Sequence, residues 1–213
     1  MNHKNNTPKS YSLKNSYFSS LANNWDKQVG NTEERIKTLH EILSTKTSIK
    51  KGDNVLDLGC GTGILIPIIH SLINNTGSIT ALDSCAEMLE EAKKKHSHLS
   101  NINFICSLIE DLEEPENKFD VVTAFAVFPH INDKKSALKK IKTILKDEGR
   151  LYIFHLAKTE RLNAFHANLD APVKHDLMPN QDEMKALFAD TGFTMIKYTD
   201  IDNLNFIEAK PCL

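Results

Sequence analysis

The sequence lacks paired cysteines, long apolar runs and a strong excess of either charge. Its four cysteines are scattered and form no CxxC pair, which excludes a zinc ribbon or a thioredoxin-type site (Cys60, Cys85, Cys106 and Cys212). The longest apolar stretch runs only from residue 121 to 129, well below the roughly 20 residues that span a bilayer. With 26 basic and 28 acidic residues, the net charge of -2 argues against nucleic acid as a partner, and no stable membrane insertion is expected.

The N-terminal segment also lacks an apolar run, so no secretory signal is visible and a cytoplasmic location is expected. Residues 1–16 are rich in Asn, Lys and Ser, which is typical of a disordered lead-in. The length of the remaining chain suits one domain with its own buried core. We expect this single domain over residues 17–213, as a monomer or a homodimer.

From residue 53 onward, short apolar segments alternate with helical patterns of about ten residues. The hydrophobic periodicity predicts strands at 54–58, 78–82, 102–106, 120–126 and 151–154, and helices at 32–46, 64–73, 86–95 and 134–145. Strands joined by helices of this length imply parallel crossovers, and therefore a sheet that is covered on both faces.

The C-terminal part breaks this alternation. A helix is predicted over 181–191, because Asn180 and Glu183 form a capping-box pattern and Gly192 can end the helix. Two strands, 193–199 and 204–210, follow with only a short Asp/Asn-rich turn between them, which favours an antiparallel hairpin. The predicted fold class is α/β, a Rossmann-like, doubly wound, seven-stranded and mostly parallel sheet with a C-terminal antiparallel hairpin.

Residues 55–63 carry the strongest chemical signal, because an apolar strand runs there into a glycine turn and then into a helix. Gly59, Gly61 and Gly63 let the backbone turn sharply and approach a ligand, and the helix that follows offers oriented N–H groups. Asp83 lies twenty residues past Gly63, where a carboxylate can accept both hydroxyls of a ribose. The pattern predicts a cofactor that contains a nucleoside; the competing interpretation is a tight turn without a ligand.

The spacing of the glycines narrows the choice of cofactor. It reads GxGxG rather than the GxGxxG of a dinucleotide site, which disfavours an NAD-linked oxidoreductase. No GxxxxGK[ST] occurs, so a P-loop is excluded. Asp57, just before the glycines, would repel a pyrophosphate but suits the ammonium or sulfonium end of a cationic ligand.

These residues resemble the class I S-adenosylmethionine-dependent methyltransferases. The segment 57–63, with the sequence DLGCGTG, matches that family's first motif, and the resemblance covers roughly residues 17–211, closest in style to the ubiquinone/menaquinone-type branch. The resemblance implies that the chain is an enzyme, using S-adenosyl-L-methionine to methylate a small-molecule acceptor and releasing S-adenosylhomocysteine. It also implies a helical lid, at residues 17–46.

The resemblance further implies a set of cofactor-binding residues. The set comprises Tyr17, Trp25, Asp57, Gly59, Cys60, Gly61, Gly63, Asp83, Ser84, Met88, Leu108, Ile109, Ala124 and Phe125. Asp57 would hold the amino group, directly or through water, and Asp83 the ribose hydroxyls. One position departs from the pattern, because Leu108 stands where the branch usually has an acid that reaches the adenine amine. Adenine recognition is therefore expected to depend on the backbone near Leu108 or on another side chain.

The acceptor is expected to meet the lid and the insert at residues 158–179, which is longer than a plain strand–helix link. The fourth strand ends in Ala124-Phe125-Ala126-Val127, where amine methyltransferases of nucleic acids carry an Asn/Asp-Pro-Pro-aromatic signature. The acceptor is therefore expected to be small, and not a nucleic acid.

Four of the nine histidines fall late in the sequence, near the expected acceptor region. They are His130 after the fourth strand, His155 at the end of the fifth, and His166 and His175 in the insert. Three interpretations stay open: structural histidines, a general base for an acidic thiol, hydroxyl or phenol, or a transition-metal site completed by Asp170 or Asp176. His130, His155 and His166 are thus candidate catalytic residues.

Two alternative functions accompany these interpretations. One is a metal-dependent enzyme that uses the histidine cluster beside the cofactor, although a transition metal is considered and not predicted. The other is a non-catalytic protein that binds S-adenosylmethionine.

Overall fold

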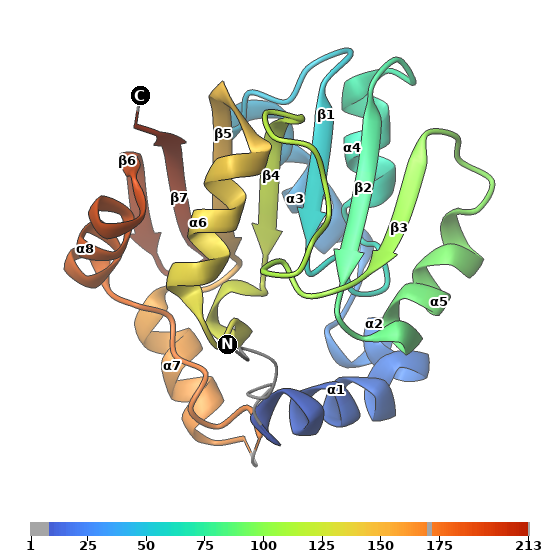
Figure 1. The fold of residues 1–213 in the computed structure, drawn as a ribbon. Coiled ribbons are helices and arrows are strands. Elements are labelled where there is room, and N and C mark those ends of the chain that lie inside the picture. The colour runs from blue at the N-terminus through green and yellow to red at the C-terminus, as the bar shows by residue number, and fades with distance from the viewer. Residues whose placement is uncertain (1–8, 170–171, 213) are drawn as a thin grey trace, which may run out of the picture.

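The computed structural model describes residues 9–169 and 172–212, which fold around a seven-stranded sheet (Figure 1). The strands are β1 (Asn54–Leu58), β2 (Ser78–Asp83), β3 (Ile102–Cys106), β4 (Phe119–Phe125), β5 (Leu145–His155), β6 (Phe193–Ile201) and β7 (Leu204–Pro211). Their order is β3-β2-β1-β4-β5-β7-β6, and β1 to β5 pair in parallel. β7 pairs antiparallel with both β5 and β6, so the predicted fold class is confirmed.

Eight α-helices and two 3-10 turns connect the strands in the described part of the chain. They are α1 (Lys9–Leu21), α2 (Trp25–Gln28), α3 (Glu33–Lys46), α4 (Ile66–Ile73), α5 (Ala86–His96), α6 (Lys134–Ile144), α7 (Thr159–Ala167) and α8 (Gln181–Thr191), with 3-10 turns η1 (Ala22–Asn24) and η2 (Phe128–His130). Helices α3, α6 and α8 begin at a capping side chain. The Thr32 side chain accepts the N–H of Arg35 at the start of α3. Asn180 and Glu183 form the predicted capping box of α8, and Gly192 ends that helix with a φ of 78°.

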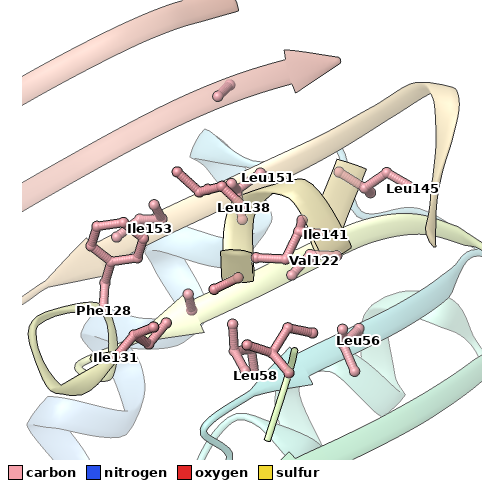
Figure 2. Close-up of a cluster of buried hydrophobic side chains, with 14 of the residues drawn as sticks. Leu56, Leu58, Val122, Phe128, Ile131, Leu138, Ile141, Leu145, Leu151 and Ile153 are labelled. Atoms are coloured by element: carbon pink, nitrogen blue, oxygen red, sulfur yellow. The ribbon is translucent and has the colours of Figure 1, made fainter. Parts of the chain in front are cut away.

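Each face of the sheet has its own apolar core. Helices α3, α4 and α5 pack on one face, and α6 and α8 pack on the other. Figure 2 shows part of the second core, where Leu56, Val122 and Leu151 from neighbouring strands meet Leu138 of α6. Because successive strand residues point to opposite faces, Val55 belongs to the first core and Leu56 to the second. This double coverage explains the nearly continuous apolar runs of the central strands.

The expectation of a disordered segment over residues 1–16 is wrong for residues 9–16, which belong to helix α1. Residues 1–8 lie outside the described part of the chain. The polar segment is held as a helix because Lys14 and Phe18, four residues apart, both contact the rest of the domain. Lys14 is buried despite its charge, and Phe18 packs edge-on against Trp25.

Two other elements begin at least two residues away from the predicted position. Strand β5 begins at Leu145 instead of residue 151, because Leu145 also pairs with Phe119 of β4 across an irregularity. Helix α4 begins at Ile66 instead of residue 64, because residues 61–65 form turns after the glycines.

The carboxyl ends of the central parallel strands lie at one edge of the sheet, beyond which Figure 1 shows α1, α2 and α7. This edge is where ligands bind in open α/β sheets. Lys14 of α1 links the edge to the segment after α7 through an ion pair of 2.5 Å with Asp176. Within residues 9–169 and 172–212, no helix is both long and apolar enough to cross a membrane.

Candidate functional site

A pocket of about 770 Å³, partly open to solvent, lies at the carboxyl ends of β1, β2, β3 and β4. Its wall consists of Lys14, Asn15, Phe18, Leu58, Gly59, Gly61, Leu82, Asp83, Ser84, Met88, Ser107, Leu108, Ile109, Ala126, Val127, His130 and Ile131. These residues come from α1, from the ends of β1 and β2, from α5 and from the segments that follow β1 to β4, so the sheet brings together segments that are distant in the sequence.

The glycine loop after β1 forms one wall of the pocket. Gly59 and Gly61 both have positive φ angles, of 66° and 54°, which glycine adopts without strain. The Gly59 N–H donates to the carbonyl of Leu82 at 2.8 Å, which fixes the loop against the end of β2. A β-carbon on Gly61 would have only the Trp25 indole nitrogen, 3.7 Å away, among its near neighbours. The loop therefore leaves its backbone open to a ligand.

Asp83 stands at the end of β2 and lines the pocket. Its Oδ2 accepts the N–H of Gly61 and its Oδ1 accepts the N–H of Cys85, both at 2.9 Å. Burial raises the pKa of Asp83, and these backbone hydrogen bonds act against the rise. Since each carboxylate oxygen can accept a second hydrogen bond, the side chain is held rigidly and still has capacity for ligand hydroxyls.

Asp57 lies in the core of β1, and its side chain is only partly satisfied. Its Oδ1 accepts a hydrogen bond from the Thr123 hydroxyl at 3.0 Å, whereas its Oδ2 has no partner among the described residues. Burial raises its pKa to about 7, the Thr123 hydrogen bond opposes this, and the charge of Asp83 adds to it. A buried carboxylate oxygen without a partner suits a cationic ligand group, so this chemistry fits the ammonium end of S-adenosylmethionine.

The loop of β4 carries the backbone strain of the site. Ala126 has a φ of 55°, which is unusual for a residue with a β-carbon, and its N–H donates to the carbonyl of Phe154 at 3.0 Å. This turn leads into η2, so that Val127 and His130 face the pocket. The strained turn therefore places the β4 loop against the glycine loop.

The structure brings half of the predicted cofactor residues to the pocket. Gly59, Gly61, Asp83, Ser84, Met88, Leu108 and Ile109 line it, whereas Tyr17, Trp25, Asp57, Cys60, Gly63, Ala124 and Phe125 do not. Cys60 and Phe125 are buried in the core, and Tyr17 packs against Phe18. On α1 the residues that line the pocket are Lys14, Asn15 and Phe18, which share one helix face. Their spacing of one and four residues is the sequence signal that identifies them.

Ser107, Leu108 and Ile109 follow β3 and line the far end of the pocket. The Ser107 hydroxyl donates to the Leu108 carbonyl at 2.9 Å. Leu108 thus occupies the position where the resembled family usually has an acidic residue. Apolar surface and peptide groups are left there to contact an adenine ring.

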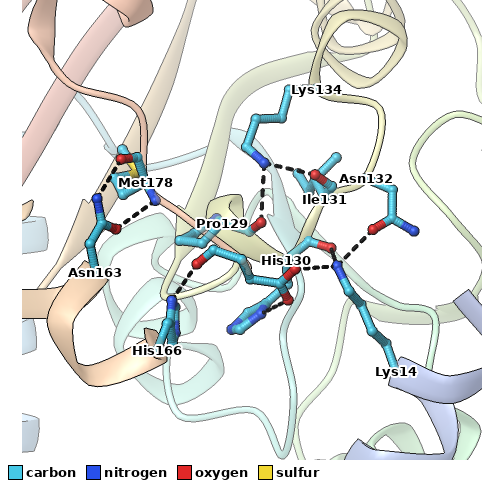
Figure 3. Close-up of polar contacts among 10 residues, drawn as sticks. Lys14, Pro129, His130, Ile131, Asn132, Lys134, Asn163, His166 and Met178 are labelled. Carbon is cyan, nitrogen blue, oxygen red and sulfur yellow. Dashed lines mark hydrogen bonds and ion pairs between the residues drawn. The ribbon is translucent and has the colours of Figure 1, made fainter. Parts of the chain in front are cut away.

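A network of buried polar groups adjoins the pocket at His130 (Figure 3). Asp176, on the segment between α7 and α8, pairs through Oδ2 with His130 Nδ1 at 2.7 Å and through Oδ1 with Lys14 Nζ at 2.5 Å. Lys14 Nζ also donates to the His130 carbonyl and to Asn132 Oδ1. Although burial pushes the pKa of Asp176 upward, its hydrogen bonds to His130 and Lys14 lower it overall.

The other candidate histidines lie near His130. His166 of α7 donates from Nδ1 to the backbone carbonyl of Asp176, and its ring centroid is 5.0 Å from that of His130. Burial is the main cause that lowers the pKa of His166. His155 ends β5, is 3% exposed, and has no hydrogen-bond partner for either ring nitrogen among the described residues. Burial lowers its pKa to about 3, and the charges of His130 and His166 add to this.

The geometry gives no support to the metal interpretation. Among residues 9–169 and 172–212, no three His, Cys, Asp or Glu side chains are placed to hold a metal ion. Asp170 lies outside the described residues, and His175 is exposed. Of the two predicted carboxylates, Asp176 is used by Lys14 and His130.

Comparisons with known proteins find similar methyltransferases. Residues 49–200 match the family described as "Methyltransferase domain". The chain is 30% identical over 187 residues to an O-methyltransferase of Aspergillus nomiae, covering 84% of this chain and 79% of that protein. It is 28% identical over 192 residues to the ubiquinone/menaquinone biosynthesis C-methyltransferase UbiE of Pseudoalteromonas translucida, covering 76% of each. A crystal structure of a SAM-dependent methyltransferase from Aquifex aeolicus superposes with a TM-score of 0.66 at 21% identity, over 83% of this chain and 96% of that one.

Proposed function

The chain belongs to the S-adenosylmethionine-dependent methyltransferases that act on small molecules, and from this premise we propose which of its residues carry the reaction. One observation carries the proposal. The same pocket is lined by the glycine loop and Asp83, which suit a nucleoside, and by His130, whose ring is oriented by the Asp176 carboxylate. In the proposed arrangement the cofactor lies along the glycine loop, and the acceptor lies beside His130, on the side of the pocket that Phe18 of α1 lines.

On the cofactor side, we assign each binding role to a residue. Bound S-adenosyl-L-methionine supplies an electrophilic methyl group on a sulfonium sulfur. The Asp83 carboxylate accepts the ribose hydroxyls, and the backbone of Gly59 and Gly61 lies along the ribose and methionine part. Asp57 attracts the ammonium group from beneath the loop, directly or through water, because its Oδ2 has no other partner among the described residues. Met88 and the peptide groups of residues 107–109 contact the adenine.

On the acceptor side, we assign the role of general base to His130. Among the three candidate histidines, the pocket wall includes His130 and does not include His155 or His166. Its Nδ1 is bonded to Asp176, so a neutral ring presents the lone pair of Nε2 to a ligand. His166 likewise uses Nδ1 as donor, which leaves Nε2 as an acceptor. Neutral imidazoles of this kind accept protons, so the site favours an acceptor that carries an acidic hydroxyl, such as a phenol or an enol.

The proposed step balances in protons and electrons. The acceptor hydroxyl gives its proton to His130 Nε2, and its oxygen lone pair forms the new bond to the methyl carbon. The bond from that carbon to sulfur breaks, and its electron pair stays on sulfur. Asp176 stays ionised and stabilises the imidazolium that forms. O-methylation is also the activity in the name of the Aspergillus relative, which supports this choice of atom.

Calorimetry with S-adenosylmethionine and S-adenosylhomocysteine tests the cofactor part. We expect both ligands to bind, and Asp83→Ala to weaken binding at least about tenfold, because two hydrogen bonds to a charged acceptor are lost. Asp111→Ala is the matched control. Asp111 is an exposed carboxylate in the segment between β3 and β4, and it is not part of the pocket wall. Equal affinities of the two variants would show that the ribose is held elsewhere.

A labelled-methyl screen over phenols, thiols, amines and carbon acids tests the acceptor part. We expect product from acidic hydroxyl compounds, with His130→Ala lowering the single-turnover rate at least about a hundredfold. Product from carbon acids or amines alone would overturn the assignment. The expected cytoplasmic location and the expected monomer or homodimer stay predictions.

A further inference from the structure

We infer that Lys14 is a positioning residue for the His130 base. Lys14 of helix α1 and His130 share the Asp176 carboxylate, and through this carboxylate Lys14 lowers the affinity of His130 for a proton. This inference rests on the proposed function, because it gives His130 the role of base. Lys14 lies outside residues 49–200, the part of the chain that matches the methyltransferase domain, so the comparison assigns it no role.

The contacts of Lys14 are those of a residue built into a site. Its side chain is 8% exposed, as is that of Asp176. Its ammonium group donates to three oxygens, namely the carbonyl of His130 at 3.1 Å, Asn132 Oδ1 at 2.6 Å and Asp176 Oδ1 at 2.5 Å. All three N–H donors are therefore used, and no donor of Lys14 is left over for a ligand. Lys14 is thus placed to act on His130 and Asp176 and not on the acceptor directly.

Asp176 divides its two oxygens between two cations in different segments. Oδ1 pairs with Lys14 of α1, and Oδ2 pairs with His130 of the β4–α6 connection. Removing one partner from such a buried arrangement leaves charge without compensation. The geometry therefore requires that α1 be docked for Asp176 to be neutralised by a second cation.

The sign of the effect follows from the charges around His130. The groups that face it are Asp176 from the α7–α8 segment, Lys14 from α1, His166 from α7, His155 from β5, Asp83 from β2 and, through its effect on Asp176, Lys134 from α6. Lys14 is the fixed positive charge that pairs with the same carboxylate, Asp176, as His130 does. Without it, the negative charge of Asp176 would stabilise the imidazolium more strongly, and His130 would become a free base only at higher pH.

Docking of α1 also encloses the pocket, because Lys14, Asn15 and Phe18 line it from one helix face. Asn15 donates to the Ser84 carbonyl at 3.1 Å, and the Phe18 ring lies edge-on to His130 with centroids 5.2 Å apart. The helix that lines the pocket therefore also sets the charge environment of the base.

The test is a pair of pH profiles for Lys14→Met, with Lys14→Arg and Lys37→Met as comparisons. The first profile is the single-turnover rate with saturating cofactor. We expect Lys14→Met to move its acidic limb upward by about one pH unit, so that the rate falls about tenfold well below the limb and recovers at high pH. Lys14→Arg keeps the charge and is expected to stay within about 0.3 unit of the wild type. Lys37, exposed on α3, is expected to have no effect when replaced.

The second profile is the NMR titration of the His130 ring in the full-length protein, which needs no acceptor and no turnover. We expect the titration midpoint of His130 to rise by the same amount in Lys14→Met. A purely structural role of Lys14 would raise KM or lower stability while leaving both profiles in place, and this result would overturn the inference. If His130 responds as expected but His130→Ala retains full activity, then the proposed base is wrong and the coupling stands.

Folding of each variant is checked by thermal unfolding and by binding of S-adenosylhomocysteine. If Lys14→Met does not fold, Asn132→Ala provides the second variant, because it removes one of the three oxygens that hold the ammonium group. We expect a shift of the His130 titration in the same direction and of smaller size. A shift in the opposite direction, or none, would count against the inference.

Discussion

Gly59 and Val127 are packed so closely that a β-carbon on Gly59 would lie 2.2 Å from Val127 Cγ2 and 2.5 Å from Val127 Cβ. The two residues belong to the loops that follow β1 and β4, and both line the pocket. The absence of a side chain at position 59 therefore lets the loops that follow β1 and β4 pack directly against each other at the pocket.

Replacing Gly59 with alanine is expected to force the two loops apart. Val127 is branched at the contact and its neighbours leave the β4 loop little freedom, so we expect the free energy of unfolding to fall by about 2 kcal/mol from overpacking. We also expect binding of S-adenosylhomocysteine to weaken at least about tenfold. Chemical denaturation and calorimetry measure the two effects.

Gly30→Ala is the matched control, because Gly30 has nearly the same φ, 64°, but a β-carbon at this position would have nothing within 4 Å of it. The substitution is expected to cost about 1 kcal/mol from the left-handed backbone alone, with ligand affinity unchanged. If both variants lose the same stability and affinity, the contact with Val127 is not what position 59 provides.

The sequence predicted those features of the structure that are determined by residues close together in the chain. The spacing of Gly59, Gly61 and Asp83 reports a strand, a turn and a second strand, and these three residues do meet in the pocket. The same is true of the capping box at Asn180, which placed the start of α8 correctly. Such signals act over a few residues, or over one crossover of known geometry, so they need no knowledge of the rest of the fold.

The contribution of α1 was missed because it depends on contacts across the whole chain. Lys14 stands 162 residues from Asp176, and nothing near it in the sequence shows that its charge is neutralised. A polar segment with such a lysine looks solvated, which led to the expectation of disorder for residues 9–16. Likewise, the sequence groups the late histidines together, but only the fold distinguishes His130, which lines the pocket, from His155, which is enclosed in the core.

The buried carboxyl of Asp57 predicts that ligand affinity depends on pH. Because burial raises its pKa to about 7, the group is protonated in the free protein at lower pH, and it must lose that proton to pair with an ammonium group. Affinity for S-adenosylhomocysteine is therefore expected to fall as the pH falls below 7, by about twentyfold between pH 7.5 and 5.5. Calorimetry in buffers of different ionisation enthalpy should show proton release on binding near pH 6.

Two comparisons isolate the role of Asp57. Adenosine lacks the amino-acid part, so its affinity is expected to stay constant over the same range. Asp57→Asn should bind S-adenosylhomocysteine more weakly at pH 7.5 and lose the pH dependence. A wild-type affinity that does not vary between pH 5.5 and 7.5 would show that Asp57 does not pair with the ligand.

His155 predicts a loss of stability in acid that a single substitution removes. Burial lowers the pKa of His155 to about 3. Below pH 6.5, His155 is therefore protonated in the unfolded chain but stays neutral in the folded protein until the pH approaches 3. The stability due to the neutral ring is present above pH 6.5 and is lost as the pH falls, by about 3 kcal/mol at pH 4.

His155→Leu is therefore expected to be more stable than the wild type at pH 4 and to differ much less at pH 7.5. His40→Leu, on the exposed side of α3, serves as the control and should show no such change. Urea denaturation at the two pH values measures the difference, and parallel losses in wild type and His155→Leu would mean that His155 takes up its proton as readily in the folded protein as in the unfolded chain.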